Sequence, residues 1–369
     1  MTGQPFKVGI VGLRAGLSWA AKAHVPALRA LPADFEIAGV ANSSLASGES
    51  AAAGMNLPKA FASVADMLAA PEIDMIAVTV RVAQHLEIVK AALEARKHVY
   101  CEWPLGNGLH EALELARIAR QQGVLGVIGT QACVAPEIQY VKQLILDGFV
   151  GEVLSTTLIG HGAAWGGIIP NEQSSAYLLD NANGATMLTI PVGHTLAALR
   201  EVLGDVIQTS SVLATRRKTA LVADSGEMLP VTAPDQVLVN GILASGVPVA
   251  LHYRGGMPRD GHGLFWEING TDGDLRLSGP FGHTQMVPLS LTGARGDEKV
   301  FQPLEVPASY LDWLPADPQT GNVARMYARM ARDLREGTKT AKTFDDAVAI
   351  HRIIAAIEQS AESGVRTAA

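Results

Sequence analysis

The stretch Phe6-Lys7-Val8-Gly9-Ile10-Val11-Gly12-Leu13-Arg14-Ala15-Gly16 decides the fold. Its first six residues form an apolar run typical of a buried strand, and a helical pattern over 17–31 follows them. A glycine turn between a strand and a helix presents backbone N–H groups that can bind a pyrophosphate. Arg14 stands where a regular Gly-x-Gly-x-x-Gly motif has its second glycine. It either places a cation beside a phosphate or is an ordinary solvated side chain.

Apolar runs and helical patterns alternate from this turn to residue 130. The runs that predict further strands are 35–41, 73–80, 98–101 and 125–129, and the patterns that predict helices between them are 63–70, 84–95 and 110–122. Strands separated by helices of this length need right-handed crossovers, which build a parallel sheet. The sequence therefore predicts an α/β, Rossmann-type doubly wound domain over residues 1–131.

The pattern changes after Pro136. A helix over 137–147 is followed by strand-like runs at 152–159, 208–214, 235–243, 247–253, 264–269 and 274–277, and the chain closes with helical patterns at 322–336 and 344–363. Glycine-containing breaks separate several of these runs. This arrangement predicts one α+β domain over residues 132–369, built on a large open, mostly antiparallel sheet with helices on one face.

Composition excludes several classes of protein. The chain has 369 residues, enough for two domains at roughly 150 residues each. Its 29 Lys+Arg against 36 Asp+Glu give a net charge of −7, which argues against a nucleic-acid partner. Cys101 and Cys133 cannot form a disulfide framework, and the histidine spacings do not suggest a metal site. Without a leader pattern or a long apolar run, we expect a cytoplasmic protein with no membrane contact.

The carboxyl ends of the predicted parallel strands supply the candidate residues for binding a dinucleotide. They are Gly12, Leu13, Arg14, Ala15, Asn42, Ser43, Ser44, Thr79, Val80, His85, Glu102, Trp103 and Gln131. The second strand ends without the carboxylate that repels a 2′-phosphate, so the sequence favours NADP while leaving NAD open. For His85, an ordinary position at a helix start is the alternative interpretation.

Several motifs occur in a family-typical order: the turn at 8–13, His24-Val25-Pro26-Ala27-Leu28, residues 91–105, Gly193-His194 and residues 343–347. In this order the chain resembles the glucose–fructose oxidoreductase / inositol dehydrogenase / MocA (Gfo/Idh/MocA) family over nearly its whole length. Ser18-Trp19-Ala20, Glu102-Trp103 and residues 192–195 look most like the branch that contains the fungal galactose-regulon repressor. That branch binds a nicotinamide dinucleotide as a regulatory ligand.

The resemblance implies an NAD(P)-dependent oxidoreductase acting on a hydroxyl or keto group of a sugar, glycoside or cyclic polyol. It also implies that residues 132–369 bind the substrate and pair the chain into a homodimer or homotetramer. The family's usual Glu-Lys-Pro is Glu102-Trp103-Pro104 here, and tryptophan has no proton to exchange at neutral pH. We therefore expect Trp103 to stack on the nicotinamide or on a sugar face.

The family's catalytic aspartate falls at Ile190, or at Thr189 in an alternative alignment. His194 then remains as the general base, with Tyr177 as a second candidate. A histidine with a pKa near 6.5 predicts a rate that rises with pH through that range. A core histidine at a helix start is the alternative for His194. The competing functions are a dinucleotide-sensing protein without turnover and, less directly, a redox-assisted elimination.

Overall fold

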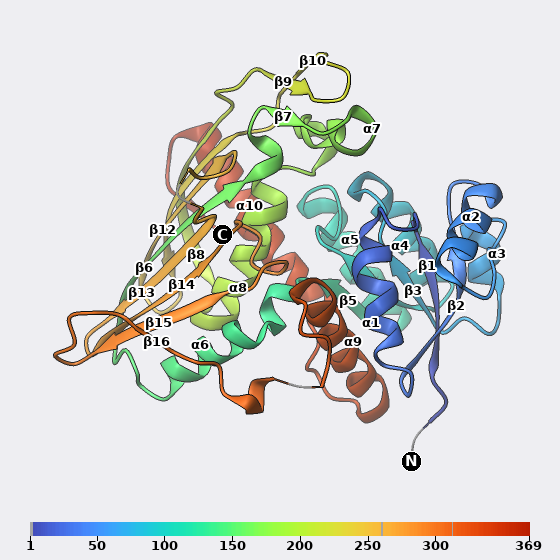
Figure 1. Cartoon of the computed structure of the whole chain (residues 1–369), viewed down its shortest axis with the longest axis horizontal. Coiled ribbons are helices and arrows are strands. Elements are labelled where there is room, and N and C mark those ends of the chain that lie inside the picture. Colours follow the sequence, from blue (N-terminus) through green and yellow to red (C-terminus); the bar gives the residue numbers. More distant parts are fainter. Residues whose placement is uncertain (1–2, 260, 312) are drawn as a thin grey trace. The chain divides into compact units, whose positions relative to one another are not determined.

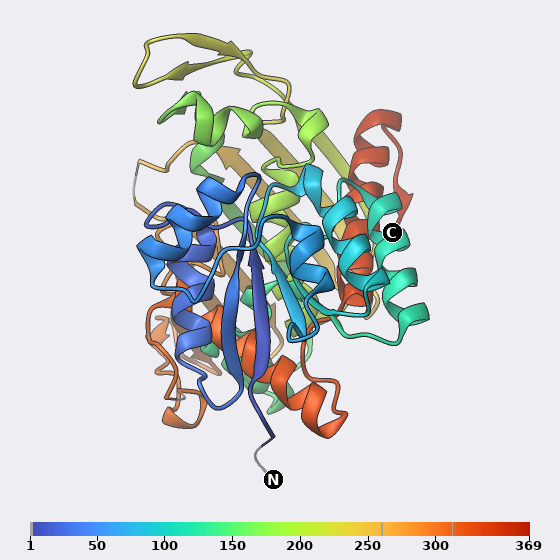
Figure 2. The same cartoon turned by 90° about the vertical axis from the view of Figure 1, so that its right-hand side faces the viewer.

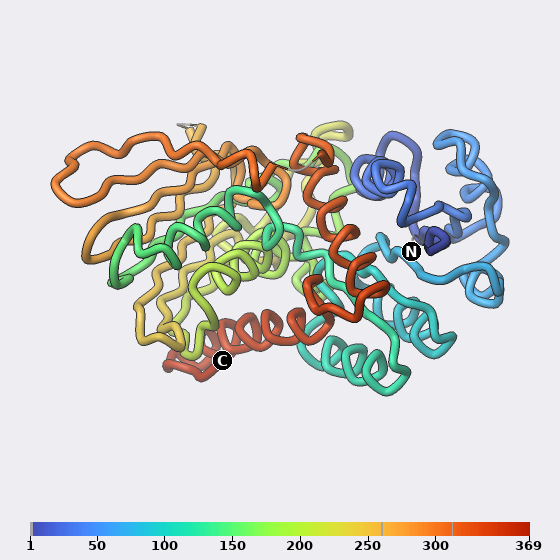
Figure 3. Tube along the Cα trace, turned by 90° about the horizontal axis from the view of Figure 1, so that it is seen from below, coloured from blue at the N-terminus to red at the C-terminus, as the bar shows by residue number. Residues whose placement is uncertain are grey.

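The computed structural model describes residues 3–259, 261–311 and 313–369. The contacts group the chain into two compact units: residues up to Gln131 with Trp313–Ala349, and residues from Ala132 on with Ile350–Ala369. Helix α10 (Phe344–Ser363), red in Figure 3, begins in the first unit and continues in the second. The sequence placed all of 132–369 in one domain, whereas Trp313–Ala349 packs with the N-terminal unit.

The N-terminal unit is built on a parallel sheet, as predicted, with strand order β2-β1-β3-β4-β5 (Figure 2). Its strands are β1 (Phe6–Val11), β2 (Phe35–Ala41), β3 (Met75–Val78), β4 (His98–Glu102) and β5 (Gly126–Gly129). All four residues of β3 are buried, as expected for a strand covered on both faces. The order reverses between β1 and β3, and ligands bind at the carboxyl ends of strands at such a point.

Six α-helices of ordinary geometry belong to this unit, and α10 adds its first turns. They are α1 (Val25–Arg29), α2 (Leu45–Met55), α3 (Val64–Ala69), α4 (His85–Glu94), α5 (Leu109–Gln122) and α9 (Pro318–Glu336). Helix α9 starts at a proline, and Asp317 caps it by accepting a hydrogen bond from the Thr320 N–H. Its partner is α1, nearly 300 residues earlier in the chain, together with the turn that precedes α1.

The helix predicted over 17–31 is present in part: the chain is helical from Trp19 to Arg29, so the helix begins later and ends earlier than predicted. The Ser18 hydroxyl donates to the Arg14 carbonyl and accepts from the Arg14 N–H, which closes a turn at the start of the segment. A π-helical turn, Ala20–His24, follows, and only Val25–Arg29 is α-helical. A hydroxyl that bonds to nearby backbone groups competes with helix formation, which is the physical reason for the late start.

The second unit contains a nine-stranded sheet of order β16-β15-β14-β13-β6-β12-β11-β8-β17 (Figure 1). Its strands are β6 (Val153–Gly162), β8 (Val206–Ala214), β11 (Gln236–Leu243), β12 (Pro248–Gly255), β13 (Leu264–Gly270), β14 (Gly273–Gly279), β15 (Ser290–Arg295), β16 (Gln302–Pro303) and β17 (Thr367–Ala368). The sheet is mostly antiparallel, as predicted. The exception is at its centre, where β6 and β12 run parallel.

Helices cover one face of this sheet. They are α6 (Pro136–Leu146), α8 (Gly193–Leu203) and the later turns of α10, and Figure 1 shows α8 and α10 beside the strands. Burial alternates along β11, as it does in a strand with one covered face. Tyr253 and Trp266 are fully buried, and the Trp266 indole N–H donates to the Thr156 hydroxyl at 2.8 Å.

A small second sheet of order β10-β9-β7 was not predicted from the sequence. It consists of β7 (Ile168–Ile169), β9 (Thr219–Val222) and β10 (Met228–Pro230), with the short helix α7 (Glu172–Ser175) nearby in the chain. Ile169, Leu179, Ala220 and Val222 form its own buried cluster. Among the described residues, no helix combines the length and apolar character needed to span a bilayer.

Candidate functional site

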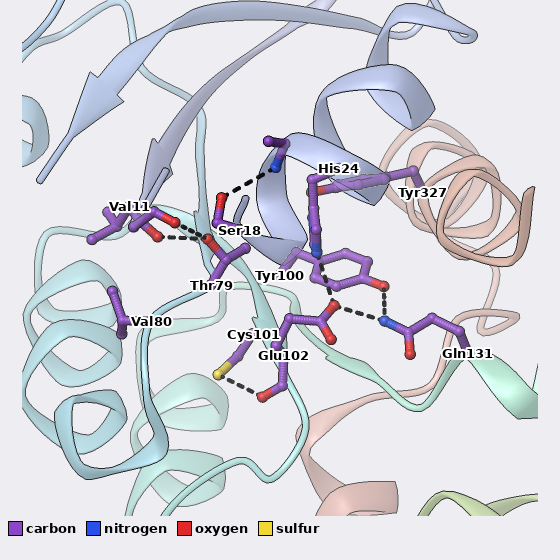
Figure 4. A network of polar contacts seen from close by, with 12 residues as sticks. Val11, Ser18, His24, Thr79, Val80, Tyr100, Cys101, Glu102, Gln131 and Tyr327 are labelled. Atoms are coloured by element: carbon purple, nitrogen blue, oxygen red, sulfur yellow. Dashed lines mark hydrogen bonds and ion pairs between the residues drawn. The ribbon is translucent and has the colours of Figure 1, made fainter. Parts of the chain in front are cut away.

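The loop after β1 is held from both neighbouring strands. Asn42, just after β2, accepts from the Leu13 N–H at 2.9 Å and donates to the Leu13 carbonyl at 2.8 Å. Thr79, just after β3, donates to the carbonyls of Val11 and Gly12 at 2.8 and 3.0 Å. Figure 4 shows the Thr79 contacts at the ends of β1 and β3. These side chains therefore position the loop through their own polar groups.

Gly12 is required in this loop for two reasons. Its φ of +95° lies in the region that favours glycine. A Cβ at this position would also lie 2.6 Å from Val80 Cγ1 and 3.2 Å from the Thr79 carbonyl carbon. A larger residue at this position would therefore force the ends of β1 and β3 apart.

The backbone N–H groups of Ala15 and Gly16 donate no hydrogen bond within the described residues. Arg14 is exposed, and Gly16 has open space where a Cβ would stand. Two unpaired amides in the turn that leads into a helical segment, next to a cation, are suited to a pyrophosphate group. The structure thus provides donors of the kind that a dinucleotide needs, although Leu13 itself is fully buried.

The turn after β2 contains no carboxylate. Asn42 is occupied with Leu13 and also donates to the Ser47 carbonyl at 3.1 Å. Ser44 is the N-cap of α2 and accepts from the Ser47 N–H. Ser43 is exposed and makes no side-chain hydrogen bond in the described part of the chain. Of the three residues predicted to contact the adenine-side ribose, Ser43 therefore has the freest polar group.

His85 links two loops at the carboxyl edge of the sheet. Its Nδ1 lies 2.8 Å from the Pro104 carbonyl oxygen, and its Nε2 lies 3.0 Å from the Val80 carbonyl oxygen. The Cys101 Sγ is 3.4 Å from the same Nδ1. Burial lowers the pKa of His85 below its usual value. Both ring nitrogens already face protein atoms, so His85 positions the loops after β3 and β4.

A buried network surrounds the Glu102 carboxylate (Figure 4). Its Oε1 accepts from Gln131 Nε2 at 2.6 Å and lies 2.9 Å from His24 Nε2. His24 Nδ1 lies 2.8 Å from the Tyr327 hydroxyl, and Gln131 also donates to the Tyr100 hydroxyl at 3.2 Å. A carboxylate only accepts, so His24 carries a proton on Nε2 and donates it to Glu102.

The network keeps its phenols protonated at neutral pH. Burial, reinforced by the Glu102 carboxylate, raises the pKa of Tyr100 and of Tyr327 well above the ordinary value of 10.0. Three residues that belong to this network or lie near its members in the chain have a buried atom without a hydrogen-bond partner in the described chain: Gln131 Oε1, Thr130 Oγ1 and Trp19 Nε1. Buried polar atoms are nearly always paired, so these groups fit a polar ligand such as the nicotinamide ribose or carboxamide.

His194 lies in the second unit, at the start of α8, where a π-helical turn (Leu188–Val192) leads into the helix. It is 3% exposed, and its Nδ1 has no hydrogen-bond partner among the described residues. Burial, with a smaller contribution from His283, lowers the pKa of His194 to about 3. The imidazole is therefore neutral throughout the physiological range. This differs from the expectation of a pKa near 6.5.

Comparison with known proteins decides the family. The model of the oxidoreductase family with an NAD-binding Rossmann fold (GFO_IDH_MocA) matches residues 6–130, and the model of the Gal80p C-terminal domain matches residues 136–279. The galactose/lactose metabolism regulatory protein GAL80 of Kluyveromyces lactis is 32% identical over 306 residues, covering 78% of this chain and 67% of that protein. The chain belongs to the Gfo/Idh/MocA family.

Other similar proteins extend over nearly the whole chain. Dehydrogenase aclE of Aspergillus oryzae is 28% identical over 376 aligned positions, covering 97% of this chain and 96% of that protein. A super-repressor mutant of Gal80p from Saccharomyces cerevisiae has a structure that matches 99% of this chain and 97% of its own, with a TM-score of 0.90 and 25% identity. This Gfo/Idh/MocA protein is thus similar both to a dehydrogenase and to a regulatory protein.

The chain departs from the Gfo/Idh/MocA pattern around the reacting groups. Trp103 is 5% exposed, so its large side chain is held within the protein. The Thr189 hydroxyl donates to the Gly184 carbonyl at 2.8 Å, and neither Thr189 nor Ile190 offers a carboxylate. Tyr177 is half-buried in a separate short turn, Ala176–Leu178, away in sequence from His194. Within the described residues, no cluster of His, Cys, Asp or Glu could hold a metal ion.

Sequence reasoning missed two features that the structure brings forward. His24 was quoted only as part of a motif, although it is fully buried against Glu102. His283 was not singled out in the sequence, and it is the residue whose electrostatic effect reaches His194. The His24-Val25-Pro26 motif was a signal that could have indicated the first. The loop around His283 has no periodicity or motif from which the second could be found.

Proposed function

We propose that the protein is an NAD(P)-dependent oxidoreductase that interconverts a hydroxyl and a keto group of a sugar, glycoside or cyclic polyol. The observation that carries the proposal is the buried, neutral and unpaired imidazole of His194. An unpaired buried polar group is unfavourable in a protein that only folds, and a neutral imidazole can accept a proton. The family and the dehydrogenase among the relatives support this class of activity.

The first unit would bind the dinucleotide. The amides of Ala15 and Gly16 would contact the pyrophosphate, with Arg14 beside it, and Ser43 would face the adenine-side ribose. The free polar atoms around Glu102, Gln131 and Trp19 would contact the nicotinamide half. Without a carboxylate after β2, a 2′-phosphate is tolerated, so NADP is favoured over NAD. The dinucleotide supplies hydride transfer when it is bound.

His194 would take the hydroxyl proton when the carbinol is oxidised and return it in the reverse direction. General-base assistance is typically worth about 10²–10⁴-fold in rate. The low pKa makes the base form fully populated in the free protein above pH 5. The rate should therefore lack the rise near pH 6.5 that an unperturbed histidine would give. Tyr177 is the substitute base, and Trp103 would stack on the nicotinamide or on the sugar.

A regulatory protein that binds a dinucleotide without turnover is the second candidate. The absence of the family lysine at Trp103 and the similarity to GAL80 favour it. Both candidates suit a homodimer or homotetramer paired through the second unit. They also suit a cytoplasmic setting, in which the buried free thiols of Cys101 and Cys133 remain reduced.

Absorbance at 340 nm separates the two candidates. Wild-type protein is mixed with NADP or NAD and a panel of sugars, anhydrosugars and cyclic polyols, and the formation of reduced dinucleotide is followed. We expect turnover with at least one compound and a loss of about 10²–10⁴-fold in His194→Ala, with dinucleotide affinity nearly unchanged. Tyr177→Phe is the matched variant for the substitute base. If no compound is turned over while the dinucleotide binds, the regulatory function replaces the enzymatic one.

A further inference from the structure

The region around His194 contains a second histidine that the proposed reaction does not use. His283 lies in the loop between β14 and β15, far from His194 in sequence. Its Nδ1 is buried and has no hydrogen-bond partner among the described residues, like Nδ1 of His194. The hydroxyl of Thr284, which is 0% exposed, is also unpaired there.

We propose that His283 is a specificity-determining residue, which together with His194 binds a neutral, hydroxyl-bearing ligand and contacts a hydroxyl other than the one that reacts. That one hydroxyl of the ligand reacts rests on the proposed function. The residues of the binding site, His194, His283 and Thr284, all belong to the second unit.

A hydrogen-bonded bridge fixes the two histidines relative to each other. The Tyr253 hydroxyl donates to the Gly282 carbonyl at 2.9 Å, so the Thr195 hydroxyl, 2.5 Å away, donates to the Tyr253 oxygen. Burial raises the pKa of Tyr253, so this phenol keeps its proton. Thr195 directly follows His194 and Gly282 directly precedes His283. The bridge therefore joins the backbones that carry both imidazoles.

The loop is also seated by close backbone contacts. A Cβ at Gly282 would lie 2.4 Å from the His161 carbonyl oxygen and 2.6 Å from its backbone nitrogen. A Cβ at Gly263 would lie 2.2 Å from the Pro280 carbonyl oxygen and 2.3 Å from the Phe281 Cα. The two glycines let the loop backbone lie directly on β6 and on the residues before β13. These contacts fix the backbone of the loop that carries His283.

Three unpaired buried atoms on two hydrogen-bonded elements point to a ligand. More than about 90% of buried polar groups in proteins have a hydrogen-bond partner. Here the exceptions stand on two elements that the bridge holds together: Nδ1 of His194 on α8, and Nδ1 of His283 with Oγ1 of Thr284 on the loop. Each neutral imidazole offers one donor and one acceptor, and the Thr284 hydroxyl offers both. Hydroxyl groups match this mixture, since each can donate and accept.

The absence of charge narrows the class of ligand. Burial alone lowers the pKa of His283 to about 4, and burial and His283 account for the low pKa of His194. In the described part of the chain, no carboxylate, lysine or arginine contributes to either shift. A phosphorylated or carboxylated sugar would therefore have no counter-charge next to these imidazoles. A neutral sugar, glycoside or polyol fits the site.

The test combines binding and stability measurements on the full chain with NADPH present. The neutral probes are D-xylose, D-glucose, D-galactose and myo-inositol, and the charged probes are D-glucuronate and D-glucose 6-phosphate. Calorimetry measures affinity, and ¹⁵N spectra of the histidine side chains report contact without any variant. We expect a neutral probe to bind and to shift the Nδ1 resonances of His194 and His283. The charged probes should bind at least tenfold more weakly.

His283→Leu should weaken binding of the neutral probe at least tenfold while the melting temperature stays equal or rises, because an unpaired buried polar group is removed. His283→Asn, which keeps a donor and an acceptor, should restore part of the affinity. His252→Leu is the matched control: it neighbours Tyr253 on β12, but its side chain points to the opposite face of the sheet. This control should leave affinity unchanged.

The possible failures are distinguishable. Binding that depends on His283 without formation of reduced dinucleotide would overturn the oxidoreductase and leave this site standing. Turnover that is insensitive to His283→Leu and His283→Asn would overturn the site and leave the oxidoreductase standing. A loss of melting temperature in both variants with unchanged affinity would make His283 structural. Failure of every neutral probe to bind, or tighter binding of a charged probe, would also overturn the inference.

Discussion

Asn42 holds Leu13 from both sides: its Oδ1 accepts from the Leu13 N–H at 2.9 Å, and its Nδ2 donates to the Leu13 carbonyl at 2.8 Å. Leu13 lies just after β1, where pairing between strands has ended. The Asn42 side chain, just after β2, therefore provides the hydrogen bonds that a neighbouring strand would otherwise make to the Leu13 backbone. The turn carries the unpaired amides of Ala15 and Gly16 two and three residues later. An amide side chain suits the position because it can donate and accept at once.

Replacing Asn42 by Ala should loosen this turn and weaken dinucleotide binding. Two neutral hydrogen bonds contribute about 1–3 kcal/mol together, which corresponds to a loss of about 5- to 150-fold in affinity if the loop must be ordered to bind. Titration with NADPH followed by fluorescence measures the change. Asn269→Ala is the control, because it removes an asparagine side-chain hydrogen bond, the one to Asp274, in the second unit. Equal affinities for Asn42→Ala and wild type would show that the turn does not bind the dinucleotide.

Arg14→Ala should weaken the binding of NADPH more than the binding of NADH. Arg14 is exposed at the turn, and the residues after β2 contain no carboxylate. An exposed charge pair is worth about 0.2–1 kcal/mol, so the selective loss should be small, about twofold to fivefold. Ser43→Asp is the complementary variant, since a carboxylate there repels a 2′-phosphate. It should shift the preference toward NADH by about tenfold. Wild-type protein that binds NADH tenfold more tightly than NADPH would contradict this interpretation of the turn.

The parallel sheet could be predicted because each of its strands and crossover helices has a pattern that is visible in a short stretch of sequence. Each strand of the N-terminal unit is a short apolar run, and a helical pattern of sufficient length for a crossover follows it. The parallel pairing of β6 with β12 could not be predicted, because no local signal distinguishes it from the antiparallel pairs beside it. Likewise, α9 is visibly amphipathic in the sequence, but its pattern does not say that it packs on α1. Partner choice is a tertiary property.

The Glu102 network should stabilise the N-terminal unit through its charged acceptor. Glu102→Gln replaces the carboxylate that faces both His24 and Gln131. Hydrogen bonds to a charged group contribute about 1.5–3 kcal/mol, and a neutral one about 0.5–1.5 kcal/mol. We therefore expect Glu102→Gln to lower the free energy of unfolding more than Tyr327→Phe, which removes only the hydroxyl bonded to His24. Urea denaturation followed by circular dichroism compares the two. The reverse order would show that the carboxylate does not organise the network.

Acid should destabilise the protein through its buried histidines. The pKa values of His194, His283 and His351 are lowered to about 3, 4 and 4, against an ordinary 6.5. Below pH 6.5 the unfolded chain binds protons that the folded protein excludes, so stability is complete above that pH and falls as the pH drops toward 4. Each such histidine steepens the loss by up to about 1.4 kcal/mol per pH unit.

His194→Leu should make the free energy of unfolding less dependent on pH, by about the contribution of one histidine. Free energies of unfolding between pH 7.5 and pH 4.5 would show it, with wild type and variant compared at each pH. The variant should equal or exceed the wild type in stability at pH 5. A slope that is identical in both proteins would mean that His194 binds its proton equally well in the folded and the unfolded chain. That result would restore the original expectation of a histidine titrating near 6.5.

The site was only partly predictable, for a physical reason. Thr79 and Asn42 were found because strand ends converge by rule, but their role in holding the loop depends on distances that a sequence does not contain. His283 was missed as a site residue because only the Thr195–Tyr253–Gly282 bridge brings it into relation with His194. Trp103 was noticed through a departure from a motif. Its burial was not expected for a residue that replaces a chemically active lysine.

The last prediction concerns Trp103. Because this side chain is buried, its packing in the core must be separated from its proposed stacking on the nicotinamide. Trp103→Ala should lower stability by about 3–5 kcal/mol through the cavity alone, and a weaker dinucleotide affinity could then follow from partial unfolding. Trp103→Phe keeps an aromatic face and should retain affinity within about threefold. Trp165 is similarly buried, 4% against 5% exposed, but lies in the second unit. Trp165→Phe is therefore the matched control.

If Trp103 stacks on the nicotinamide, Trp103→Leu should weaken NADPH binding by about tenfold, since stacking on an aromatic ring contributes about 1–3 kcal/mol. Trp165→Leu should lower the melting temperature comparably and leave NADPH binding unchanged. Affinity is measured well below both melting temperatures, so that partial unfolding does not contribute. If Trp103→Leu loses stability but binds NADPH like the wild type, Trp103 is a core residue. In that case, the loss of the family lysine would have removed a reacting group without replacing it, which favours the regulatory function.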